Sequence, residues 1–431
     1  MSTTPRALCL ELLLRQCAAG QYANLTLDSA LKRDKALSPA DRGLCTALFY
    51  GVIEHRITLD YIIDGLSTLP PSAIEERVRM ILRMGLCQLL NFDRVPDHAA
   101  INEAVVLTPR RSRGFVNAVL RGFCRRGKQV DYPDPEGAPL RYLSVRYSVP
   151  EALAEAFCRG YGFARAERLF DAFSKTPAVT VRVNTARTTR EAFLEQYGGT
   201  PTAISPHGVR FATAEGVAGA IAAGECFVQD EASQICTEAV GARTGERVLD
   251  LCAAPGSKSF GMALSMENTG EVASFDLHEN KLSLIRTGAA RLGLSIITAR
   301  AGDAREADPA KLGLFDRVLC DVPCSGYGVL AKKPDIRYKD VTAAAGLVPV
   351  QAAILERGAA CVAPGGLLVY STCTLLPAEN GEQVSAFLAH HPEFVPEPFS
   401  VGHTHFDGVV TLAPDTHSTD GFFVARLRKK G

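Results

Sequence analysis

The pattern of apolar and polar positions changes along the chain from purely helical spacing to alternating strands and helices. From residue 6 to about 128, apolar residues recur three and four positions apart, as at Leu48 and Val52. This spacing predicts a segment made almost wholly of helices. Three prolines between residues 131 and 139 then predict a linker or a domain boundary.

Beyond the linker, the pattern predicts two further structural units. Residues 140–232 combine helical stretches with short strands, which is typical of a small α+β subdomain. From Glu246 to a final strand over 420–427, short apolar runs alternate with helical stretches, which predicts an α/β domain with a doubly wound, mostly parallel sheet. We therefore expect three domains: an all-helical domain over 1–130, a small α+β subdomain over 140–232 and an α/β catalytic domain over 233–431.

Composition indicates an ordinary globular protein of the reducing cytoplasm. The 431 residues carry no net charge, and 47% of them are hydrophobic. The first residues lack a charged stretch followed by an apolar core, and no apolar run approaches the ~20 residues of a membrane helix, so neither a signal peptide nor membrane association is expected. Thirteen cysteines, an odd number with no Cys-x-x-Cys pair, argue against a disulfide framework.

Charge is distributed unevenly along the helical segment. Between Arg110 and Lys128 there are seven basic residues and no acidic one. A basic helical face of this kind can bind the phosphates of a nucleic acid. From charge alone, a solvated face whose arginines lie along apolar surface explains the run equally well. Arg182 and the Lys332–Lys333 pair are further candidate phosphate contacts.

Three short motifs each follow a predicted strand. Asp-Leu-Cys-Ala-Ala-Pro-Gly-Ser-Lys covers 250–258, Pro323-Cys324 lies within 321–326, and Thr372-Cys373 lies within 371–374. In an open α/β sheet, residues just past the carboxyl ends of the strands converge on one crevice. We therefore expect two thiols and Lys258 to face one bound ligand. A thiolate next to a nucleotide-like cofactor indicates covalent catalysis.

The first of these motifs is predicted to bind the cofactor. Its backbone N–H groups open a helix, and Gly256 permits close approach of a ligand. It lacks the Walker A order and the Gly-x-Gly-x-x-Gly pattern, which disfavours a dinucleotide. Acidic residues after successive strands, including Asp276 and Asp303, fit S-adenosylmethionine, which has ribose hydroxyls and no phosphate. Taken singly, Asp303 is explained better by an N-cap or a turn than by a ligand contact, and it is the series of acids that favours the ligand. The candidate cofactor-binding residues are Cys252, Ala253, Ala254, Pro255, Gly256, Ser257, Lys258, Asp276, Asp303 and Asp321.

Taken together, the motifs resemble the bacterial Sun/RsmB family of RNA cytosine-5 methyltransferases. The matching segments are DLCAAPGSK (250–258), DVPCSGYG (321–328), KPDIRY (333–338), STCTLLPAEN (371–380) and DGFF (420–423). The N-terminal half resembles the NusB-like helical domain of that family, through GQYANLTLDSAL (20–31), DRGLCTALFYGVIEHRITLDYII (41–63), DRVPDHAAINEAV (93–105) and GFVNAVLRGF (114–123). The resemblance covers nearly the whole chain. It implies a Rossmann-like class I methyltransferase domain, S-adenosyl-L-methionine as cofactor, and 16S rRNA or a precursor of the small ribosomal subunit as partner.

The same resemblance gives the two thiols separate roles. Carbon 5 of cytosine is too weakly nucleophilic to take a methyl group until a thiolate adds to carbon 6. The resemblance assigns that attack to Cys373, and the later steps, proton removal or product release, to Cys324. Lys258 and Asp321 could orient or polarise the base, and Lys258 could lower the pKa of a thiol. Singly, each cysteine could be a small core residue and Lys258 a solvated lysine.

Other readings stay open from the sequence. A DNA cytosine-5 methyltransferase would use Cys324 as its nucleophile. A non-enzymatic RNA-binding or antitermination factor would act through residues 1–128, and a protein methyltransferase would leave both thiols without a role. His403, His405 and His417 lack a cysteine or carboxylate at ligand spacing, so no metal is expected. Nothing in the pattern indicates a dimer interface, so a monomer is expected.

Overall fold

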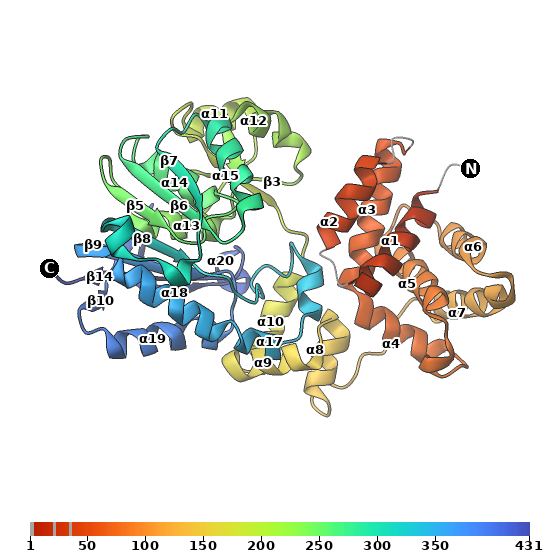
Figure 1. The fold of residues 1–431 in the computed structure, drawn as a ribbon. Helices are drawn as coiled ribbons and strands as arrows, with labels where there is room; N and C mark the ends of the chain where they lie inside the picture. The colour runs from red at the N-terminus through yellow and green to blue at the C-terminus, as the bar shows by residue number, and fades with distance from the viewer. Residues whose placement is uncertain (1–3, 20–22, 34–36) are drawn as a thin grey trace. The chain divides into compact units, whose positions relative to one another are not determined.

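The protein consists of two compact units in the computed structural model, which describes residues 4–19, 23–33 and 37–431 (Figure 1). The first unit runs up to Asp171 and includes Lys333–Lys339, and the second comprises Ala172–Lys332 and Asp340–Gly431. The expected domain borders at residues 130, 140 and 232 stay predictions, because the division into two compact units does not test them. Across the described ranges, no helix is both long and apolar enough to cross a membrane.

The first unit is helical, as the spacing of its apolar residues predicts. Ser38 caps α3 by accepting a hydrogen bond from the Asp41 N–H at 3.2 Å, and Pro39 occupies the first helical position. Leu48 and Val52 are buried in a core built around α5. The helices are α1 (Pro5–Ala19), α2 (Ala23–Arg33), α3 (Pro39–Glu54), α4 (Arg56–Leu66), α5 (Glu76–Asn91), α6 (Asp97–Leu107), α7 (Arg113–Arg125), α8 (Pro139–Tyr147), α9 (Glu151–Tyr161) and α10 (Phe163–Phe173).

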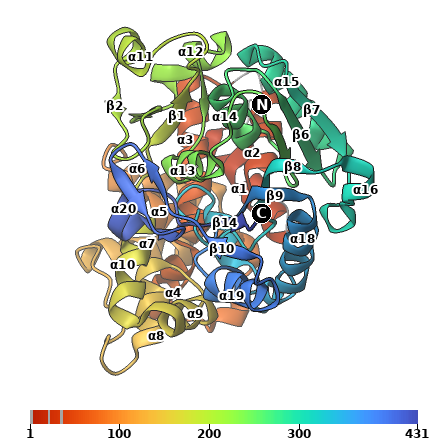
Figure 2. The same ribbon diagram turned by 90° about the vertical axis from the view of Figure 1, so that its left-hand side faces the viewer.

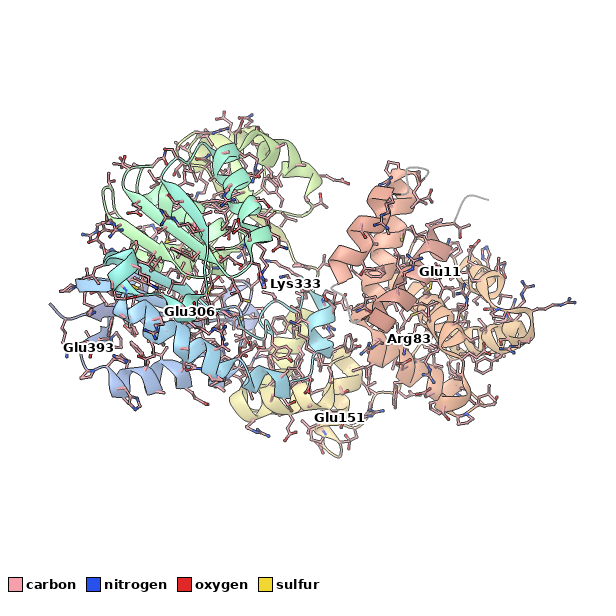
Figure 3. All side chains as sticks on the ribbon, in the orientation of Figure 1. Glu11, Arg83, Glu151, Glu306, Lys333 and Glu393 are labelled. Atoms are coloured by element: carbon pink, nitrogen blue, oxygen red, sulfur yellow. The ribbon has the colours of Figure 1, made fainter. Side chains whose placement is uncertain are left out.

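A short segment from far along the chain completes this unit. Lys333, labelled in Figure 3, begins the segment, which contains the 3-10 turn η5 (Pro334–Tyr338). The Tyr338 hydroxyl donates to the Ile53 carbonyl at 2.7 Å, and the guanidinium of Arg337 donates to the Glu54 carbonyl at 2.8 Å. The KPDIRY motif therefore packs with the helices rather than with the sheet that precedes it in sequence.

The second unit begins with a small antiparallel sheet of order β2-β3-β1-β4. Thr189 caps the helix that follows its first strand. Arg182 on that strand is 1% exposed and pairs with Glu238 at 2.6 Å, so its prediction as a phosphate contact is wrong. The elements are β1 (Val179–Val183), α11 (Arg190–Tyr197), β2 (Thr200–Pro201), β3 (Gly208–Phe211), α12 (Ala218–Ala223), β4 (Cys226–Val228) and α13 (Glu231–Val240).

The main sheet has eight strands, and five of them are parallel, which confirms the doubly wound prediction. Its order is β10-β14-β9-β8-β5-β6-β7, with β13 also paired to β14. The last strand, β14, runs antiparallel to β9, β10 and β13. The strands are β5 (Arg247–Asp250), β6 (Glu271–Asp276), β7 (Ile297–Ala301), β8 (Phe315–Asp321), β9 (Val362–Thr372), β10 (Phe394–Pro396), β13 (Val409–Leu412) and β14 (Phe422–Lys429); β11 (Phe399–Val401) and β12 (Thr404–Phe406) form a separate hairpin.

Helices cover both faces of the main sheet. Figures 1 and 2 show α18 and α19 together on one face, where Ile354 and Phe387 join the core, while α13, α14 and α15 pack on the other. Strand order runs one way from β5 to β6 and the other way from β5 to β8, so the ligand crevice of such a sheet lies past the ends of β5 and β8. The helices are α14 (Ser257–Ser265), α15 (Glu279–Leu292), α16 (Pro309–Leu312), α17 (Thr342–Ala345), α18 (Val348–Ala360), α19 (Gly381–His390) and α20 (Pro414–His417).

Candidate active site

The two cysteines of the sequence motifs lie side by side at the ends of neighbouring strands. Asp321 of β8 is in register with Ser371 of β9, which brings the loops that follow the two strands together. The Sγ atoms of Cys324 and Cys373 are 3.3 Å apart, within reach of an S–H···S hydrogen bond and well beyond the ~2.05 Å of a disulfide. Both side chains are partly exposed. The structure therefore presents a pair of reduced thiols in the crevice.

Lys258 reaches the same crevice from the first turn of α14. Its ammonium group donates to Asp321 at 2.7 Å, and the Ser371 hydroxyl donates to the other oxygen of that carboxylate at 2.7 Å. Burial alone would lower the pKa of Lys258, but the Asp321 carboxylate outweighs it and the pKa is raised. Negative charge at Cys373 adds to this effect, so the lysine and that thiol are electrostatic neighbours. Lys258 is a permanent cation beside Cys373.

The loop that carries Cys324 is fixed against its neighbours through glycine backbone. Gly328 N–H donates to the Cys373 carbonyl at 2.9 Å, and Gly421 N–H donates to the Gly328 carbonyl at 2.7 Å. A Cβ atom on Gly328 would collide with the carbonyl oxygen of Gly421, which is backbone and has little freedom to move. Gly328 thus lets the two cysteine loops and the start of β14 meet.

Replacing Gly328 with alanine is expected to destabilise the second unit by about 2 kcal/mol, because the added carbon forces backbone apart. The measurement is the free energy of unfolding in urea. Gly381→Ala is the matched control, since a Cβ there meets no atom within 4 Å. Equal stability of the two variants would contradict the close contact between the loops.

The predicted cofactor loop connects β5 to α14. Gly256 has φ 111°, a conformation that suits glycine, and a Cβ atom there would lie 2.5 Å from the ring of Phe260. Burial raises the pKa of the Cys252 thiol well above its usual value, so this group is neutral. The loop cation, Lys258, is engaged by Asp321 rather than presented to a phosphate. These features fit a cofactor that has no phosphate.

Asp276 lies at the end of β6, beside this loop. Its carboxylate accepts hydrogen bonds from the Ala254 N–H at 3.2 Å and the His278 N–H at 3.0 Å. This is the position at which an acid receives ribose hydroxyls in nucleotide-binding sheets. The loop backbone and Asp276 are therefore the groups that would hold an adenosyl cofactor.

Two other acids after the strands have structural partners. Asp303 caps η4 (Ala304–Glu306) and bonds the guanidinium of Arg305 at 2.5–3.1 Å. Its contact with a ligand stays a prediction. Asp250 is buried, accepts from the Ser259 hydroxyl at 2.7 Å, and has its pKa raised to about 7 by burial. It joins β5 to α14 and belongs to the core beneath the loop.

Of the remaining candidate phosphate contacts, one is held by carboxylates and the others lie exposed on the surface. The ammonium group of Lys332 lies between the carboxylates of Asp230 and Asp420, at 2.6 and 2.8 Å. This lysine is therefore held by two carboxylates, and its contact with a phosphate stays a prediction. The basic run from Arg110 to Lys128 keeps its arginines exposed. Over the described ranges, no group of three or more histidine, cysteine or acidic side chains could hold a metal ion.

One buried acid of the site is not among the candidate residues that the sequence motifs predict. Glu379, in the STCTLLPAEN motif, is 1% exposed and accepts hydrogen bonds from Ser325 and Gln351. The sequence signal that could have pointed to Glu379 is its place in the motif that also contains Cys373. Spacing alone does not show that it faces the other cysteine.

Comparison with known proteins agrees with both units. The family described as 16S rRNA methyltransferase RsmB/F matches residues 238–428, and the NusB family matches residues 3–125. A Bacillus subtilis (strain 168) protein named probable ribosomal RNA small subunit methyltransferase B is 38% identical, with 100% of this chain and 99% of that protein covered.

Solved structures of other proteins have a fold similar to that of this chain. The structure of PH0851 has a TM-score of 0.77 at 25% identity, covering 99% of this chain and 98% of that one. NSun6 from Pyrococcus horikoshii, solved with SFG, an S-adenosylmethionine analogue, has a TM-score of 0.58 at 21% identity and covers 65% of this chain and 98% of its own.

The fold and the crevice define a Rossmann-like, S-adenosylmethionine-dependent methyltransferase with a NusB-like helical domain. More specifically, the chain belongs to the family of ribosomal RNA small subunit methyltransferase B. It is an enzyme that methylates rRNA, and its cofactor is S-adenosylmethionine. The non-enzymatic reading of the helical half is thereby wrong.

Proposed function

We propose that this enzyme methylates carbon 5 of a cytosine in 16S rRNA through a covalent adduct between Cys373 and carbon 6 of the base. The observation that supports this most is the thiol pair, 3.3 Å apart, with the cationic Lys258 on the Cys373 side. Neither a DNA-type enzyme with one nucleophilic thiol nor a protein methyltransferase needs this arrangement.

Cys373 supplies the nucleophile. Its thiolate attacks carbon 6, the C6–S bond forms, and the ring electrons move to carbon 5, which becomes nucleophilic. S-adenosylmethionine supplies the methyl group when bound. Lys258 stabilises the thiolate before attack, and Asp321 holds the lysine in place.

Cys324 serves the second half of the reaction. After methylation, the proton on carbon 5 must leave and the C6–S bond must break, which returns the electron pair to the sulfur of Cys373 and restores the ring. Cys324 is the group 3.3 Å from that sulfur. We assign it to proton removal or to release of Cys373, and without it the adduct should persist.

The target base must lie outside a stack, because the thiol approaches the ring face. Single-stranded loops of rRNA meet this requirement. On the first unit, Arg125 and Arg126 border a surface hollow of about 340 Å³ between α4 and α7, which Phe115 also lines. We propose that this basic surface binds RNA phosphates.

Exchanging Arg110, Arg125 and Arg126 for glutamate is expected to weaken RNA binding and to flatten its salt dependence. Each lost phosphate contact should lower the slope of log K against log salt by about one. The measurement is a salt titration of binding to a small-subunit rRNA fragment. Exchange of three other arginines of this unit, the exposed Arg159 and Arg168 and the half-buried Arg165, is the control. An unchanged slope would remove the basic run from the RNA-binding surface.

Nucleoside analysis of the product tests the proposed function. Unmodified small-subunit rRNA is incubated with the enzyme and S-adenosylmethionine, digested, and examined by mass spectrometry. The proposal predicts 5-methylcytidine, with no comparable product on DNA of the same sequence. A methylated nucleoside of another kind, or equal activity on DNA, would contradict it.

A further inference from the structure

Glu379 is a buried carboxylate directly behind the Cys324 loop. Its Oε2 atom accepts from the Ser325 backbone N–H at 2.9 Å and from the Gln351 amide at 2.8 Å, and its Oε1 atom accepts from the Ser325 hydroxyl at 2.5 Å. The side chain is 1% exposed. Because these groups donate to both oxygens, the arrangement suits an ionised carboxylate, which only accepts hydrogen bonds.

Both peptide groups that flank Cys324 are held by this cluster. Glu379 binds the N–H of Ser325, and Gln351 of α18 donates to the Pro323 carbonyl at 3.0 Å as well as to Glu379. The hydroxyl of Tyr370 on β9 donates to the backbone carbonyl of Glu379 at 2.6 Å, which fixes η6 (Pro377–Glu379) against the sheet. The position of Cys324 therefore depends on Glu379.

The two thiols face opposite charges. The hydrogen bond to Cys373, burial and the negative charges of Cys373 and Glu379 all raise the pKa of Cys324. On the other side of the pair, Lys258 of α14 interacts with Cys373 and is itself paired with Asp321 of β8. Tyr370 of β9 also faces Cys324, and its raised pKa, caused first by burial, keeps it neutral. An anion thus lies behind Cys324 and a cation beside Cys373.

We propose that Glu379 determines which thiol ionises: its charge keeps the proton on Cys324, which donates its S–H to Cys373, so that Cys373 is the thiolate. Glu379 acts through Cys324 and is a positioning residue. The inference rests on the proposed function, in which Cys373 is the nucleophile, and it explains how two thiols in contact take different roles.

Glu379→Gln removes the charge while keeping the shape. The glutamine carbonyl can accept from the Ser325 N–H and from Gln351. Its NH₂ group can donate to the Ser325 hydroxyl, which turns its own proton to the Thr374 hydroxyl 2.7 Å away. Ser325→Ala is the matched control, because it removes the hydrogen bonds of the Ser325 hydroxyl to Glu379 and Thr374 and keeps the charge.

Alkylation of the full-length protein tests the inference without RNA or cofactor. Iodoacetamide is applied between about pH 6 and pH 9, and peptide mass spectrometry gives the rate at each cysteine. Wild type should alkylate Cys373 about tenfold faster than Cys324 or more. In Glu379→Gln, Cys324 should react about tenfold faster and its pH midpoint should fall by about one unit. Ser325→Ala should keep the wild-type ratio and midpoint.

An unchanged Cys324 midpoint in a folded Glu379→Gln protein would overturn the inference, as would near-equal rates in wild type. If Glu379→Gln does not fold, the ratio of the Cys373 and Cys324 alkylation rates in wild type still tests the inference. Alkylation does not depend on methyl transfer. Asymmetric thiols without 5-methylcytidine in the product would therefore support the role of Glu379 and reject the proposed function, and symmetric thiols with that product would do the reverse.

Discussion

Cys373→Ala is expected to lower methyl transfer to rRNA by about four orders of magnitude or more. The reason is that carbon 5 of the base stays unreactive unless a thiolate adds to carbon 6, and the residual activity of an enzyme without its nucleophile comes from binding alone. The measurement is single-turnover transfer of labelled methyl from S-adenosylmethionine. Cofactor affinity should stay within about twofold of wild type, since the cofactor loop is formed by other residues.

Cys158→Ala is the matched control for this loss. Cys158 is also partly exposed, lies on α9 of the first unit, and has no role in the proposed chemistry. Its transfer rate should equal that of wild type. If Cys373→Ala kept transfer within about a hundredfold of wild type, Cys373 would not be the nucleophile. Loss of transfer in Cys324→Ala, without adduct, would then indicate the roles of a DNA-type enzyme.

Lys258→Met should have the second largest effect, on rate and on stability together. The change leaves the Asp321 carboxylate without its cation, and breaking a buried pair in this way costs about 3 kcal/mol. It also removes the cation beside Cys373, so single-turnover transfer should fall on the order of a hundredfold. The pH at which transfer reaches half its maximum should rise, because the thiolate loses its stabilising charge.

The stability loss in Lys258→Met should be present throughout the range from about pH 6 to pH 9. The folded pKa of Lys258 is raised, so the stability it provides is fully present below its ordinary pKa and is lost only as pH rises through the folded value. Urea unfolding at several pH values measures this. Lys311→Met, at an exposed position on α16, is the control. A loss that disappears as the pH rises through this window would show that Lys258 is not a permanent cation.

The sequence predicts the fold and the proximity of Cys324 and Cys373, because both follow from the local pattern of strands, helices and motifs. Alternating strands and helices allow few topologies, and parallel strands bring residues past their carboxyl ends to one edge. Cys324, Cys373 and Lys258 are therefore found together before any coordinate is known. The final strand is predicted as a strand, whereas its antiparallel direction depends on pairing with β9.

Groups that act through long-range packing are not visible in the sequence. Glu379 faces the Cys324 loop because the Tyr370 hydroxyl fixes η6 against β9, and Gln351 joins it from α18. Likewise, Arg182 and Lys332 resemble free cations in sequence until Glu238, Asp230 and Asp420 approach them from distant segments. The KPDIRY segment shows the same limit, since only tertiary contacts reveal that it packs with the helical unit.

Covalent trapping on denaturing gels is the most direct test of the two-thiol mechanism. Wild type, Cys324→Ala and Cys373→Ala are each incubated with unmodified small-subunit rRNA and S-adenosylmethionine, and RNA-linked protein is quantified after denaturation. The mechanism predicts a denaturant-stable adduct that accumulates in Cys324→Ala and is absent in Cys373→Ala. An adduct that forms in Cys373→Ala and not in Cys324→Ala would contradict it and make Cys324 the nucleophile.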